Sequence, residues 1–95
     1  MSVPITKGGV KTVAAGATNV TITFATDDQL AGTPLAFPTG YTVVVTCVVQ
    51  KTTNSWATSI QLDDAPSLTS VQVNFGTAAP AYGGNLHWLA QGYKT

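Results

Sequence analysis

Charged side chains are scarce in this chain, and two of the four charged residue types are missing. Its 95 residues include no Arg and no Glu, only four Lys and four Asp, and the formal net charge is +0. Surfaces that bind nucleic acid carry clusters of basic residues against the phosphates, so no nucleic-acid partner is expected. A weakly charged chain with 44% hydrophobic residues instead favours an apolar surface that is covered by self-association.

Groups that could carry chemistry are also few, since the chain has one Cys and one His. Cys47 lies in an apolar run and has no second Cys with which to form an intrachain disulfide, so we expect a buried, inert thiol. No Cys/His cluster has the spacing of a zinc site, and no acidic loop has that of an EF-hand. The sequence therefore predicts no metal and no cofactor.

Paired carboxylates occur twice, at Asp27-Asp28 and at Asp63-Asp64. Adjacent residues of an extended chain point to opposite sides, and both pairs lie where a turn is expected. We interpret them as turn or cap residues rather than as a catalytic pair. Because no nucleophile with a base is recognisable, the protein is not expected to be an enzyme, and a small-molecule hydrolase is the least favoured alternative.

Long apolar runs are missing as well. The longest, over residues 43–49, is interrupted by Thr46 and is far shorter than the roughly 20 residues needed to cross a bilayer. The first four residues show no basic segment leading into an apolar stretch, so no secretory signal is expected. We therefore expect a protein made in the cytoplasm and not inserted into a membrane.

Strand-forming residues dominate, because Thr and Val are abundant while the usual helix formers are few. Apolar and polar positions alternate strictly over residues 20–24 and 71–75, which predicts two half-buried strands. Residues 41–49 form a continuous β-branched run that is apolar on both faces. We interpret this run as a central strand, with Val44 and Val48 covered by a loop or by a neighbouring protomer.

Weaker patterns complete the set of expected strands. An edge strand is expected near residues 10–14, a returning strand over residues 56–62, and a closing strand from Leu86. Two long loops with Gly and Pro, residues 26–40 and 76–85, separate the strands. The prediction is an all-β fold: one antiparallel β-sandwich of six to seven short strands over residues 10–95, after a flexible lead-in or arm over residues 1–9.

The closing strand carries the most informative pattern of the sequence. Its alternation places one set of side chains in the core and the other set toward a neighbouring protomer or a ligand. The expected core set is Leu86, Trp88 and Ala90, and the opposite set is His87, Leu89 and Gln91.

The Trp88-x-Ala90-x-Gly92 ending, together with the alternating strands before it, resembles the C-terminal knob of bacteriophage tail fibre proteins. That fold is similar to the H-type lectins. The resemblance covers residues 10–93, with the long loop over residues 27–40 and the lack of a preceding fibre shaft as departures. It implies a six-stranded antiparallel sandwich that assembles as a trimer in the virion and binds a host-surface carbohydrate without catalysis.

Carbohydrate sites combine an aromatic stacking face with planar hydrogen-bonding groups. The resemblance to the H-type lectins implies a sugar site near a subunit boundary, formed by residues late in the chain. The candidate ligand-binding residues are Tyr82, His87, Tyr93 and Trp56. For His87 we favour a surface or interface residue, with a polar contact in a sugar pocket as the functional alternative. The competing hypothesis is a capsid or tail decoration protein that binds only other proteins of its own virion.

Overall fold

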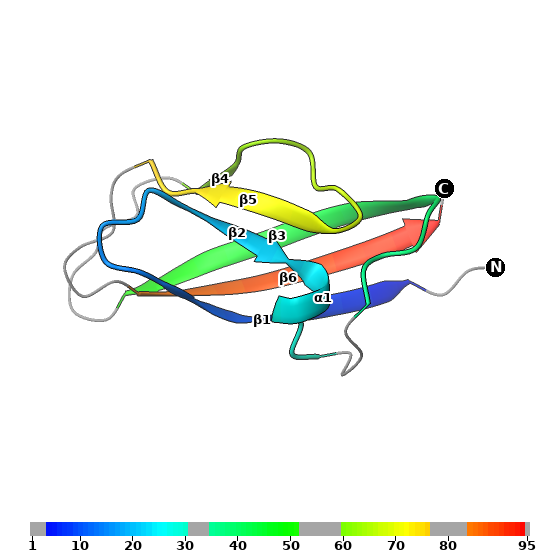
Figure 1. Ribbon diagram of the computed structural model, residues 1–95, viewed down its shortest axis with the longest axis horizontal. Coiled ribbons are helices and arrows are strands. Elements are labelled where there is room, and N and C mark those ends of the chain that lie inside the picture. The colour runs from blue at the N-terminus through cyan, green and yellow to red at the C-terminus, as the bar shows by residue number, and fades with distance from the viewer. Residues whose placement is uncertain (1–3, 31–34, 52–59, 77–83, 95) are drawn as a thin grey trace.

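The computed structural model describes residues 4–30, 35–51, 60–76 and 84–94, and it confirms the all-β prediction (Figure 1). Within these ranges the chain forms six strands and one short helix. In chain order these elements are β1 (Ile5–Val13), β2 (Asn19–Thr23), α1 (Phe24–Asp27), β3 (Tyr41–Lys51), β4 (Gln61–Leu62), β5 (Ser70–Asn74) and β6 (Gly84–Lys94). No helix of the described segments is long and apolar enough to span a membrane.

The strands form two antiparallel sheets of three strands each, stacked on one another (Figure 1). Sheet A has the order β1-β6-β3, and sheet B has the order β2-β5-β4. The closing strand β6 is the centre of sheet A, where it pairs with β1 from Gly84 to Gly92 and with β3 from Gly84 to Lys94. The predicted antiparallel sandwich is therefore present, and its longest pairings involve the last strand.

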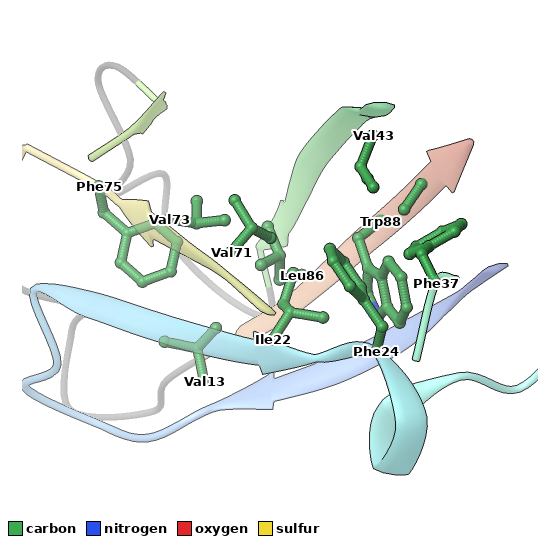
Figure 2. Packing of buried hydrophobic residues seen from close by; sticks show 11 residues of the cluster. Val13, Ile22, Phe24, Phe37, Val43, Val71, Val73, Phe75, Leu86 and Trp88 are labelled. Carbon is green, nitrogen blue, oxygen red and sulfur yellow. The ribbon is translucent and has the colours of Figure 1, made fainter. Parts of the chain in front are cut away.

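The core fills the space between the two sheets (Figure 2). Its buried apolar residues are Val13, Ile22, Phe24, Phe37, Val43, Val71, Val73, Phe75, Leu86, Trp88 and Ala90. At one end of the core the Phe24 ring lies edge-on to Phe37, with centroids 5.1 Å apart, and 5.9 Å from Trp88. The alternation of the closing strand thus predicted the core set of β6 correctly.

One core donor is left without a partner. The indole Nε1 of Trp88 is buried and has no hydrogen-bond partner in the described part of the chain. Burial of such a donor costs about 1–3 kcal/mol. Trp88 is kept in the core by the burial of its rings against Phe24, not by a hydrogen bond.

The strand of the continuous β-branched run, β3, lies at the edge of sheet A, so the prediction of a central strand was wrong. A run that is apolar on both faces belongs in the middle of a sheet only if both faces are covered, and sheet B covers only one of them. On the other face Val44 and Val48 are 53% and 61% exposed. No loop within the described residues shields them.

The first strand begins earlier than its sequence indicated. Residues 5–9, expected in a flexible lead-in, form the first half of β1 and pair with β6. A contact with the residue after α1 holds this part of the chain in the sheet. Lys7 points into the protein, its Nζ lies 3.6 Å from Asp28 Oδ2, and both side chains are almost fully buried. The Lys7 ammonium also lies 5.6 Å from the centre of the Phe37 ring.

Both residues of the Asp27-Asp28 pair accept backbone hydrogen bonds, as predicted for turn and cap residues. Asp28 Oδ1 accepts from the N–H groups of Gly8 and Leu30, each at 3.0 Å, and Asp27 Oδ2 accepts from the N–H of Thr23 at 2.8 Å. Asp27 Oδ2 also bonds the Lys11 Nζ at 2.7 Å. Two Lys–Asp pairs therefore fasten α1 and the residues after it to β1.

Candidate functional site

The face of sheet A that points away from sheet B is the most unusual surface of the described chain. Its residues alternate with the buried ones and the strand register brings them side by side. They are Thr6, Gly8, Val10 and Thr12 on β1, Thr42, Val44, Thr46, Val48 and Gln50 on β3, and Asn85, His87, Leu89, Gln91 and Tyr93 on β6. None of them is Asp or Lys. We call this surface the outer face.

Exposed apolar side chains occupy the middle of the outer face. Val10, Val44, Val48 and Leu89 are each 40% exposed or more. The register places Val10 and Val48 on opposite sides of His87, while Leu89 is the next outward residue of β6. Four apolar residues without a neighbouring charge are typical of a surface that contacts another protein chain.

The loop after α1 adds a further apolar residue, Leu30, to the outer face. Gly8 lacks a side chain, and the space beside it is lined by the Leu30 and Leu89 methyl groups, which lie 3.0 and 3.1 Å from where a Cβ would stand. The hydrogen bond from the Leu30 N–H to Asp28 fixes the loop there. Leu30 was not predicted as a surface residue. Its sequence signal is a single Leu after the polar residues 27–29, but only the fold places it beside Gly8.

His87 points outward, opposite to Trp88, as the alternation predicted. Its Nε2 lies 2.7 Å from Oε1 of Gln50 on the neighbouring β3. Because a Gln Oε1 only accepts hydrogen bonds, Nε2 is the donor and carries the proton. Gln50 was not found from the sequence, since only the pairing register between β3 and β6 places it beside His87.

The predicted ligand-binding residues do not form one compact site in the described structure. Tyr93 is 46% exposed and lies on the outer face, but it is six residues from His87 along β6, a separation of about 20 Å. Tyr82 and Trp56 lie outside the described residues. A single small ligand therefore does not contact both His87 and Tyr93 of one chain.

Cys47 belongs to the inner side of β3, opposite Trp88 in the register. It is half-buried rather than fully buried, because β3 is at the sheet edge. Desolvation raises the pKa of its thiol above the usual 9.0, so the group is protonated at neutral pH and is a poor nucleophile. Across the described ranges, no three side chains of His, Cys, Asp or Glu are placed to hold a metal ion together.

Comparison with known proteins gives no assignment. No protein-family model, no curated protein and no solved structure matches this chain. What the protein binds must therefore be inferred from its own surface.

Proposed function

We propose that this protein is a non-enzymatic binding protein of a virion surface, and that it works as a homo-oligomer whose copies meet through the outer face, a trimer by its resemblance to the tail fibre knobs. The observation that carries the proposal is the group of exposed apolar residues, Val10, Val44, Val48 and Leu89, on a face without Asp or Lys. An uncharged face can be buried against copies of itself without desolvating a charge.

Burial of these side chains would contribute favourably to association. Fully burying a Val or Leu side chain contributes about 1.5–3 kcal/mol, and these residues are about half exposed in the isolated chain. Each therefore has roughly 1 kcal/mol still to contribute on association. Leu30, which is 59% exposed, adds a further contribution at the β1 side of the face.

A receptor-binding role of the tail fibre knob type agrees with the closing strand. Trp88 and Ala90 of the Trp-x-Ala-x-Gly ending are buried in the core, and Gly92 makes room for the Phe37 ring. His87 and Tyr93 supply the polar and aromatic groups with which a host-surface carbohydrate would be contacted. Since they are far apart within one chain, each would act with groups from a neighbouring copy or from residues outside the described segments.

The decoration protein is the second candidate, and the apolar centre of the outer face favours it. A protein that binds only its own virion needs a broad apolar contact surface and no polar site for a sugar. Under this alternative the outer face, or part of it, meets another virion protein.

Light scattering followed by a glycan array on the same sample tests both candidates. We expect a mass of three copies, or of a multiple of three where a second contact joins trimers, and binding to at least one glycan; a Tyr93→Ala variant should keep this mass and lose the glycan signal. A trimer without any glycan signal favours decoration, and a monomer at all concentrations contradicts the proposed assembly. Gln72→Ala, on the exposed side of sheet B, is the matched control and should behave as the wild type.

A further inference from the structure

The free edge of β3 is the second unusual feature of sheet A. In an antiparallel pair, alternate residues exchange backbone hydrogen bonds with the partner strand. On β1, the backbone N–H and carbonyl groups of Gly8 point away from β6, because the N–H donates to Asp28 Oδ1 and the carbonyl oxygen accepts from the Gln29 N–H. The registers of β1 with β6 and of β6 with β3 carry this alternation across the sheet. The residues of β3 whose N–H and carbonyl groups point away from β6 are therefore Val43, Val45, Cys47 and Val49.

These backbone groups have no partners in the described structure. The pairing of β3 with β6 runs without a break from Tyr41 to Lys51. On the opposite edge of β3, the turn bond from the Tyr41 N–H to the Pro38 oxygen is the one backbone hydrogen bond between described residues. Figure 1 shows β3 as one border of sheet A. The sheet therefore ends in a row of open donors and acceptors about 20 Å long, from Val43 to Val49.

The two edges of sheet A differ in how they are protected. On β1, the residues after α1 cover the edge, where Gln29 Oε1 accepts from the Val10 N–H and Asp28 accepts from the Gly8 N–H. Edges of natural sheets are otherwise blocked by Lys, Pro, bulges or short strands. From residue 42 to residue 50, β3 has none of these.

We propose that two copies of this chain pair antiparallel through β3, so that sheet A continues across a two-fold axis with the two β3 strands at its centre. The register that pairs the whole strand is centred on Thr46. It places Val44 of one copy opposite Val48 of the other, and Val45 opposite Cys47. This contact is made by the backbone edge of β3, whereas the contact of the proposed function is made by the outward side chains of sheet A; Val44 and Val48 belong to the outer face and also lie beside the edge contact.

A second copy of the chain is the partner that fits the apolar residue pattern of β3. The run is apolar on both faces, which is typical of a central strand, and pairing through the edge makes β3 central. The facing Val44 and Val48 side chains form cross-strand pairs and extend the apolar outer face over the junction. Residues 41–50 of β3 carry no charged side chain, so pairing these residues with those of a second copy brings no like charges together.

Amide hydrogen exchange on the native protein, followed by NMR as a function of concentration, tests the pairing. We expect the amides of Val43, Val45, Cys47 and Val49 to exchange at least about tenfold more slowly at high concentration than after dilution. In a Leu89→Asn variant, which removes the outer-face contact, this slowing should remain. Fast exchange at every concentration overturns the pairing, and slowing that disappears with Leu89→Asn assigns it to the outer face and overturns the pairing as well.

Cross-linking gives an independent test of the register. A Val45→Cys variant should form an intermolecular disulfide with Cys47 of a second copy, since hydrogen-bonded antiparallel neighbours lie about 5.5 Å apart at Cα, within the range of a disulfide. Oxidised Val45→Cys should run as a covalent dimer, while Thr21→Cys, on the exposed side of sheet B, should not. Equal dimer yields from the two variants contradict the register. A trimer that gives neither slowed amides nor a cross-link leaves the outer-face proposal standing and refutes the edge pairing alone.

Discussion

Replacement of Gly92 by Ala tests how tightly the end of the core is packed. Gly92 is buried on β6, and an added Cβ would lie 2.6 Å from Cε1 of Phe37 and 3.3 Å from Cδ2 of Tyr41. The Phe37 ring cannot simply move away, because the residue is 3% exposed and its ring packs edge-on against Phe24. The backbone of Phe37 is also fixed, since its N–H donates to the Leu68 oxygen at 3.0 Å. Overpacking of this kind costs about 1–3 kcal/mol.

Urea unfolding of a double-mutant cycle measures this cost directly. We expect Gly92→Ala to lower the unfolding free energy by about 1–3 kcal/mol in the wild type, out of a total of about 5–15 kcal/mol. In a Phe37→Val background the ring atoms that block the methyl group are gone, so the same substitution should cost less than about 0.5 kcal/mol. An equal cost in both backgrounds, or no cost in the wild type, would refute the packing contact.

Three further predictions concern other parts of the fold. Asp28→Asn should destabilise the protein by about 3–5 kcal/mol in urea unfolding, because it leaves the Lys7 ammonium buried without its charge partner, and Lys7→Met in the same chain should recover most of the loss. Burial raises the pKa of the Cys47 thiol in the folded protein, so the stabilisation by the protonated thiol is complete below pH 9.0 and is lost as the pH rises through the folded pKa. The unfolding free energy of Cys47→Val should lack this alkaline loss. Equal pH profiles of the wild type and the variant would contradict the prediction. Gly16→Ala should cost about 1 kcal/mol in thermal unfolding through its φ of 82° alone, since nothing lies near its Cβ position, and a neutral result would contradict that reading.

Alternation in the sequence predicted which side chains face the core. Over residues 71–75 the period of two is strict, and along β6 it is interrupted only by the outward Leu89; Val71, Val73, Leu86 and Trp88 are buried as expected. The fold class follows from such patterns, because each strand of a sandwich needs one apolar face. Local periodicity determined the orientation of these strands almost completely.

Neighbour relations could not be predicted in the same way. A period of two says which face is buried but not which strand lies alongside, so the central position went to β3 in the prediction and to β6 in the structure. The bond between His87 and Gln50 and the buried Lys7–Asp28 pair join residues far apart in the chain, and they depend on register and on tertiary packing. Part of the candidate surface was therefore predicted, from the outward residues of β6 and from Val44 and Val48, whereas Val10, Leu30 and Gln50 were not.

Sedimentation equilibrium of the wild type and of Leu89→Asn, with Thr21→Asn on the exposed side of sheet B as the control, tests the central claim that the outer face joins copies of this chain. We predict an oligomeric wild type and control, and a lower mass for Leu89→Asn with an NMR spectrum that still shows a folded protein, since Leu89 is exposed in the isolated chain. A wild type that stays monomeric at high concentration, or a Leu89→Asn variant with the wild-type mass, would contradict the claim.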